Sequence, residues 1–289
     1  TSDDAGSTKQ RIRRIRRFTP KALQSSQAHT NLRAAARAET IGTVLKSIAS
    51  ILIYGVAVFT VLAEVGINLA PLIAGAGVVG VALPVSLLVG DWWFVDGKPT
   101  TRGSLSAYYH SGMRDVFVAS LAVIGLFLLT YMAFHYNWDN VLSMVGGLSA
   151  IGVAMFPTDG GEVLTPLQRE LGETVVAAIH YTCAGVFILS LAAISWRFGT
   201  REHARPDRTE DQQQRWWLYH RVCASTVVAA VVFIVVTQAT GVWDSYSILI
   251  GEAVAALAFG LSWFVKGAEL DVLLGERRAP TPAAGPVQP

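Results

Sequence analysis

Ionisable side chains are rare within the long apolar stretches of this sequence, and the few that occur are the first candidates for chemistry. A charged group among lipid chains is costly, so one that persists there usually has a partner or a function. The candidates, together with one serine, are Asp91, Ser106, His110, Arg114, Asp115, His180 and Glu252. If successive stretches cross a membrane in alternating directions, all of these residues reach the same face. We therefore expect them to form a polar cup.

Two kinds of chemistry suit such a cup. Histidine and carboxylate side chains can together bind a metal ion that activates water, or they can relay protons. The alternative is structural, because helix ends carry polar residues anyway and Asp115 at a helix start can cap free backbone amides. Glu252 is harder to explain in this way, since a carboxylate within a helix needs a partner. His180 and Arg114 are the candidate partners on the same face.

The spacing from Ser106 to His110 is similar to the Ser-x-x-x-His element of the alkaline ceramidase superfamily, whose members are seven-helix membrane hydrolases that use zinc. The resemblance implies a zinc site at this face. That superfamily also supplies a His-x-x-x-His pair from its last helix, where this chain has Glu252 and no histidine. Because three zinc ligands are not in evidence, no metal or cofactor is predicted, and His110 and His180 are the remaining candidates for a metal ligand.

The elements that must position the cup are apolar helices. Hydrophobic residues make up 52% and charged residues 15% of the 289 positions, whereas an average soluble domain is roughly 25% charged. Most of the apolar runs approach the roughly 20 residues that cross a bilayer. They are 47–65, 69–94, 116–134, 141–156, 175–196, 222–241 and 245–265. The sequence predicts an all-α membrane protein with about seven transmembrane helices and no soluble β domain.

Tryptophan placement supports this segmentation, because indole rings favour the interface between membrane and water. Every tryptophan lies near a predicted helix end: Trp92, Trp93, Trp138, Trp196, Trp216, Trp217, Trp243 and Trp263. The six runs from residue 69 onward also agree with the charges of their loops. The loop 197–221 holds six arginines, whereas 158–174 holds four acidic residues and one arginine. Since basic loops stay in the cytoplasm, we expect a multi-pass protein of a bacterial inner membrane with its polar cup outside.

The first 40 residues form a separate basic segment. A basic stretch beside a membrane helix contacts anionic lipid headgroups more often than nucleic acid, and here it would do so through Arg11, Arg13, Arg14, Arg16 and Arg17. If the run 41–65 spans the membrane, this segment lies outside, against the charge rule. Three resolutions remain open: an interfacial first run, an outward N-terminus, or a join between two unrelated pieces.

Residues 37–83, RAETIGTVLKSIASILIYGVAVFTVLAEVGINLAPLIAGAGVVGVAL, resemble the inner helices of the small-conductance mechanosensitive channel family. The resemblance implies an outward helix followed by a pore-lining helix in a homo-oligomer. Small residues let helices approach closely, and the candidates for that contact are Ala74, Gly75, Gly77 and Gly80. The same residues also suit packing between helices of one chain. The family's β-rich cytoplasmic domain has no counterpart here.

Residues 84–274 resemble an uncharacterised family of bacterial six-helix membrane proteins. The resemblance is carried by SLSAYYHSGMRDVFVASLAVIGLFLLTY, GLSAIGVAMFPTD, LYHRVCAS and AFGLSWFVKG. It implies a fold and no established activity. We therefore predict a basic segment at 1–40, a channel-like helix pair at 41–83, a helical bundle at 84–275 and a disordered Pro/Ala tail at 276–289, with a join near residues 80–84.

The expected function is a membrane-embedded module for binding, sensing or transport. A channel component related to mechanosensitive channels is the first alternative, and a metal-dependent membrane hydrolase is the second. Soluble enzyme classes find no support, because the sequence has no P-loop, GxSxG elbow or HExxH motif. Whether the chain is an enzyme is left open, with a non-enzymatic role favoured.

Overall fold

A computed structural model describes residues 70–94, 101–131 and 138–268, together with scattered positions between 42 and 65. The chain divides into two units, residues 1–53 and 54–289, and all of the long helices named below belong to the second. The predicted basic segment with its arginines and the Pro/Ala tail lie outside the described residues. The predicted helix 41–65 is described only in part, at positions that are helical.

Helices form all of the regular structure in the described residues, with no strand among them. The long ones are α3 (Ala70–Phe94), α4 (Arg114–Tyr131), α5 (Trp138–Met155), α7 (Glu173–His203), α8 (Glu210–Thr240) and α9 (Asp244–Ala268). A short 3-10 helix, η1 (Ser106–His110), precedes α4, and α6 (Pro166–Leu171) precedes α7. This confirms the all-α prediction for the part of the chain that the structure describes.

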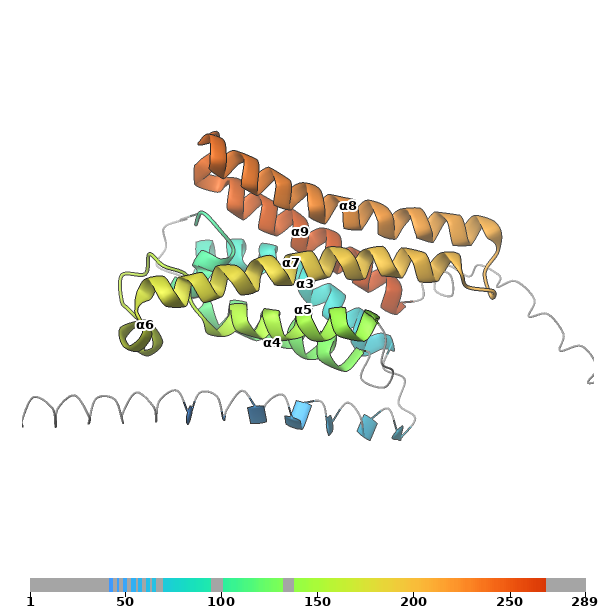
Figure 1. Ribbon diagram of the computed structural model, residues 1–289, viewed down its shortest axis with the longest axis horizontal. Coiled ribbons are helices and arrows are strands. Elements are labelled where there is room, and N and C mark those ends of the chain that lie inside the picture. The colour runs from blue at the N-terminus through green and yellow to red at the C-terminus, as the bar shows by residue number, and fades with distance from the viewer. Residues whose placement is uncertain are drawn as a thin grey trace, which may run out of the picture. The chain divides into compact units, whose positions relative to one another are not determined.

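The long helices run side by side along roughly one direction (Figure 1), and their contacts form a closed ring. Helix α3 contacts α4 and α9, and the ring continues from α4 through α5, α7 and α8 back to α9. Apolar side chains fill its centre, among them Leu87, Leu128 and Val227, each at most 1% exposed. The ends of the ring are therefore the places where polar side chains from different helices can meet.

Glycines hold α3 close to α9. A Cβ on Gly77 would lie 2.5 Å from the backbone nitrogen of Phe264, and one on Gly260 would lie 2.8 Å from the backbone nitrogen of Val81. Such close backbone approach requires the absence of a side chain on both helices. Gly80 also faces Gly260, whereas a Cβ on Gly75 would meet nothing within 4 Å. Gly77 and Gly80 thus pack helices within one chain, which is one of the two roles that the sequence leaves open.

Helices α7 and α8 continue well beyond the apolar runs that predict them. The sequence assigns 197–221 to a loop, and this is wrong, because helix covers all of that range except residues 204–209. Thr209 explains the early start of α8: its hydroxyl accepts a hydrogen bond from the Gln212 amide, and the Gln212 side chain accepts one from the Thr209 amide. This capping box stabilises a helix start that hydrophobicity does not mark.

Four helices in the described part of the chain are long and apolar enough to cross a membrane: Ala74–Trp93 within α3, α7, α8 and Ser245–Ala268 within α9. Helices α4 and α5 have 18 residues each, slightly fewer than the roughly 20 that span a bilayer. Trp93, Trp138 and Trp243 are highly exposed near helix ends, as predicted. Trp263 differs, since it is 1% exposed and packs against Phe198 and Phe259 in the core.

Candidate functional site

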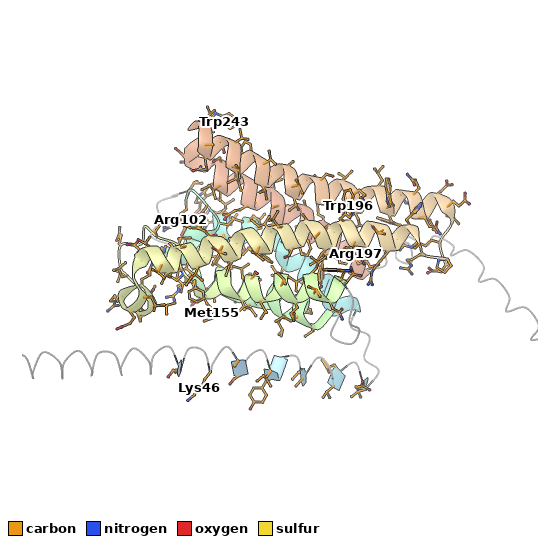
Figure 2. All side chains as sticks on the ribbon, in the orientation of Figure 1. Lys46, Arg102, Met155, Trp196, Arg197 and Trp243 are labelled. Carbon is orange, nitrogen blue, oxygen red and sulfur yellow. The ribbon has the colours of Figure 1, made fainter. Side chains whose placement is uncertain are left out.

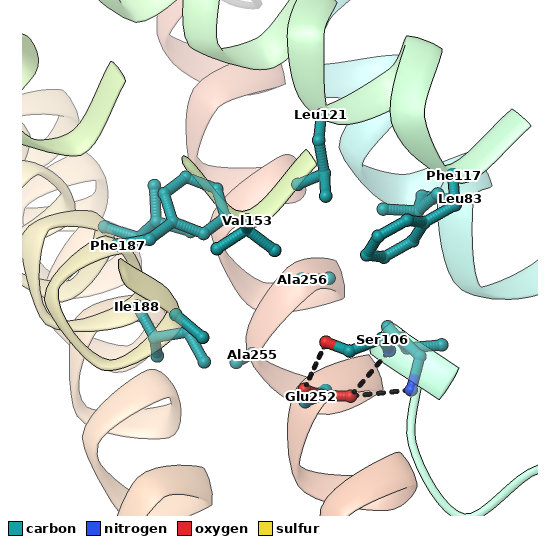
Figure 3. Close-up of a pocket in the computed structure, with 13 residues that line it drawn as sticks. Leu83, Ser106, Phe117, Leu121, Val153, Phe187, Ile188, Glu252, Ala255 and Ala256 are labelled. Carbon is teal, nitrogen blue, oxygen red and sulfur yellow. Dashed lines mark hydrogen bonds between the residues drawn. The ribbon is translucent and has the colours of Figure 1, made fainter. Parts of the chain in front are cut away.

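Glu252 projects from α9 toward the start of η1 (Figure 3). Its Oε2 accepts a hydrogen bond from the Leu105 amide at 2.6 Å and a longer one from the Ser106 amide at 3.4 Å, and its Oε1 accepts from the Ser106 hydroxyl at 3.1 Å. A carboxylate at a helix start pairs with free backbone N–H groups. The partners expected from the sequence, His180 and Arg114, are therefore wrong. They were chosen by membrane face alone, whereas the chain before α4 folds back onto α9.

His180 is fully buried near the start of α7. Its Nδ1 lies 2.5 Å from the carbonyl oxygen of Phe156, which can only accept, so Nδ1 carries the proton. In the neutral ring Nε2 is then an acceptor, and it has no hydrogen-bond partner among the described residues. A buried acceptor left without a donor costs roughly 1–3 kcal/mol. His180 is therefore a buried, neutral ring with one nitrogen that the described residues do not pair.

A cavity of about 460 Å³ adjoins both residues. We call it the His180 cavity. Its polar lining includes Ser106, Asp159, His180, Tyr181 and Glu252, and the Tyr181 hydroxyl donates to Asp159 at 2.5 Å. Its apolar wall comes from α7, α8 and α9: Ala184, Gly185, Ile188, Leu189, Val231, Ile234, Val235 and Ile248. One end of this space is therefore polar and the other resembles the interior of a membrane.

A second, smaller cavity of about 60 Å³ lies at the centre of the bundle (Figure 3). We call it the central cavity. It shares Ser106, Ala184, Ile188 and Glu252 with the His180 cavity, and the rest of its lining is apolar. The hydrogen-bonded pair of Ser106 and Glu252 consequently stands between the two spaces. A change in that pair would alter both of them.

The other predicted cup residues lie elsewhere. His110 and Arg114 line a separate cavity, where His110 Nε2 lies 2.9 Å from the carbonyl oxygen of Thr158 and Arg114 donates to the Tyr109 hydroxyl at 2.8 Å. Asp115 is exposed at the start of α4. The expected single cup is therefore divided, with Glu252, Ser106 and His180 around one cavity and His110 and Arg114 around another.

Asp91 forms a third group at the same end of the bundle. It is 1% exposed and lies 3.7 Å from Nε of Arg102, a residue that the sequence analysis did not select. The Arg102 guanidinium also lies 5.9 Å from the centre of the Tyr108 ring. Burial raises the pKa of the Tyr108 phenol above its ordinary value, so the hydroxyl stays protonated. The positive charge of Arg102 therefore balances the negative charge of the buried Asp91 carboxylate.

The sequence analysis also missed a network of buried charges at the opposite end of the bundle. The Glu202 carboxylate, 2% exposed, pairs with Lys266 of α9 and with Arg208 at 2.8 Å. Nearby, Asp139 of α5 pairs with Arg197 and Arg201. Figure 2 shows Arg197 toward this end and Arg102 and Trp243 toward the other. A lysine close to the end of an apolar run, together with an acid in an arginine-rich segment, is the signal that could have predicted this network.

Hydrogen bonds from Arg205 hold a neighbouring carboxylate in its charged form. Arg205 donates to both carboxylate oxygens of Asp207, at 3.0 and 2.7 Å, and thereby lowers the pKa of Asp207 to about 2. Asp207 lies in the short connection between α7 and α8. This pair lies in the turn that brings Arg208 back to Glu202.

No set of three His, Cys, Asp or Glu side chains is placed to hold a metal ion within the described ranges. The zinc site implied by the Ser106–His110 spacing therefore gains no support from the geometry. Comparisons with protein-family models, with curated proteins and with solved structures find no match. The resemblances seen in the sequence stay predictions.

The capping role of Glu252 predicts a difference between two substitutions. Glu252→Ala leaves the Leu105 amide without its described acceptor and should lower the free energy of unfolding by about 1–3 kcal/mol. Glu252→Gln keeps an acceptor oxygen and should lose less than half as much. Thermal unfolding in nanodiscs measures both. Equal losses for the two variants would show that the negative charge, not the hydrogen bond, is what matters.

Proposed function

We propose that this chain is a multi-pass membrane protein whose His180 cavity binds an amphiphilic small molecule with a hydrogen-bond-donating head, such as an amine or an alcohol. The single observation that carries this proposal is the 460 Å³ cavity itself, whose lining joins a polar end with Asp159, His180 and Glu252 to an apolar wall. Cavities of several hundred Å³ with few polar groups are typical small-molecule sites. The proposal specifies the binding, sensing or transport module expected from the sequence.

The charges of the cavity favour a donor or a cation as the head of the ligand. Two carboxylates line it, Asp159 and Glu252, and the described residues of its lining include neither lysine nor arginine. An acceptor-only head such as a carboxylate would meet like charge.

The wall of the cavity favours an apolar tail. Leu189 of α7 and Val235 of α8 line the cavity and are also 55% and 60% exposed on the bundle surface. In a bilayer these side chains would face lipid, so a tail reaches the cavity directly from the acyl chains. With the arginine-rich end of the bundle in the cytoplasm, the cavity lies in the outer half of the membrane.

Binding is tested with octylamine, octanol and octanoate, which share a tail and differ in the head. The protein is placed in nanodiscs, and thermal unfolding is followed as each compound is added. We expect octylamine and octanol to raise Tm by a few degrees, because they bind the folded state alone. Octanoate should raise it much less. If octanoate stabilises the protein as well as octylamine does, the proposed recognition is wrong.

Two variants locate the effect. Asp159→Asn removes one of the two lining carboxylates and should reduce the preference for octylamine over octanoate. Gly185→Leu fills the cavity instead: a Cβ at Gly185 meets nothing within 4 Å, so the variant should fold and yet bind none of the compounds. Unchanged stabilisation of Gly185→Leu by octylamine would place binding outside the His180 cavity.

A further inference from the structure

A separate cavity of about 710 Å³ lies at the same end of the bundle as the His180 cavity and is enclosed by the segments around η1 and α6. We call it the arginine cavity. Its lining includes three arginines, Arg102, Arg114 and Arg169, together with His110. Glu162 is the only carboxylate among the described residues of that lining. The excess of positive charge contrasts with the His180 cavity, whose charged lining residues are acidic.

Each of the three arginines is held by a contact of its own. Arg102 pairs with Asp91 at 3.7 Å, and the Arg169 Nε donates to the Leu164 carbonyl at 3.0 Å. The Arg114 guanidinium lies 4.5 Å from the centre of the Tyr109 ring and donates to the hydroxyl of the same residue. Each of these contacts involves one nitrogen, whereas a guanidinium carries five N–H donors in all. We expect the remaining donors to be available to a ligand.

The surroundings separate this cavity from the first. The Thr158 carbonyl accepts from His110 Nε2 at 2.9 Å and from the Gln168 side chain at 3.0 Å. Thr158 lines the His180 cavity, whereas Gly160 and Gly161 line the arginine cavity. The segment 158–161 thus separates the two cavities. They can therefore take ligands of opposite charge.

We propose that the arginine cavity binds a phosphate group, which belongs either to a lipid headgroup or to a free phosphate compound. Guanidinium groups bind phosphate through paired, charge-assisted hydrogen bonds, and their planar fork matches its oxygens. The three arginines carry more positive charge than Glu162 can neutralise. Of the three, Asp91 pairs with Arg102. The site is independent of the His180 cavity and of the ligand proposed for it.

The test uses the double variant Arg114→Gln/Arg169→Gln, because both side chains are exposed and Arg102 is left to its buried partner Asp91. Arg215→Gln, an exposed arginine in α8 near the opposite end of the bundle, is the control. Inorganic phosphate is titrated against protein in zwitterionic nanodiscs at constant ionic strength, with thermal unfolding as the readout. A second arm compares nanodiscs with and without an anionic phospholipid.

If inorganic phosphate stabilises the wild-type protein, we expect its apparent affinity to fall about tenfold in the double variant but not in Arg215→Gln. This result supports a site for free phosphate. Stabilisation by the anionic phospholipid alone, lost in the double variant, supports a headgroup site. If neither anion stabilises the wild-type protein, or if the double variant responds as the wild type does, the proposal is overturned. An equal loss in Arg215→Gln would show general charge screening and would also overturn it.

Discussion

Gly77→Leu is expected to lower the free energy of unfolding by about 3 kcal/mol or more, because the interface between α3 and α9 has no room for a side chain there. A Cβ at this position would lie 2.5 Å from the Phe264 nitrogen and 2.8 Å from the Gly260 carbonyl oxygen. Both are backbone atoms, so relief requires the two helices to separate. Separation removes contacts along the whole interface.

Gly75→Leu is the matched control, two residues away on the same helix. A Cβ at Gly75 meets nothing within 4 Å, and leucine is a better helix former than glycine. We expect this variant to be as stable as the wild type or slightly more so. Thermal unfolding and the folded yield after purification compare the two. Similar destabilisation of both variants would mean that α3 packs on α9 through another face.

Glu202→Ala is expected to cost about 3–5 kcal/mol, the range found when one partner of a buried ion pair is removed. The change removes the carboxylate that pairs with Lys266 and Arg208, whose side chains are 15% and 9% exposed. Two cations would then face each other in a poorly hydrated space. The same network joins the end of α7 to α9, so the ends of both helices should loosen together.

Replacing the charged residues together by apolar ones distinguishes the cost of an unpaired buried charge from the loss of packing. Glu202→Leu/Lys266→Met/Arg208→Met should recover most of the lost stability, since well-packed apolar residues can replace a buried charged triad. Asp207→Asn, at a partly exposed ion pair nearby, should change stability by no more than about 0.5 kcal/mol. A Glu202→Ala variant as stable as Asp207→Asn would contradict the network.

The apolar runs sufficed to place the long helices, because about 20 apolar residues have few stable arrangements other than a buried or membrane-spanning helix. The ends of α7 and α8 were not predictable in this way. There the helix is maintained by capping at Thr209 and by the ion pairs of Glu202, neither of which leaves a hydrophobic trace. Local side-chain chemistry therefore set the boundaries that hydropathy missed.

The sequence predicts which residues share this end of the bundle, but not which groups they contact there. Helix alternation correctly brings Glu252, Ser106 and His180 to one end, but it carries no information about rotation around the helix axis or about the path of a loop. Only the fold of 101–110 against α9 shows that Glu252 meets backbone amides. Likewise, the packing of Gly77 on Gly260 joins the channel-like stretch to the following bundle across the predicted join. The join itself stays a prediction.

The most direct test of the account is photolabelling of the His180 cavity. A photoactivatable analogue of octylamine is crosslinked to the protein in nanodiscs, and the labelled residues are mapped by mass spectrometry. Binding in the His180 cavity predicts that the label is concentrated on the facing segments 184–189 of α7 and 231–235 of α8. Octanol should displace this label, and Gly185→Leu should not acquire it. Label spread over the apolar surface in proportion to exposure, and unchanged in Gly185→Leu, would contradict this prediction.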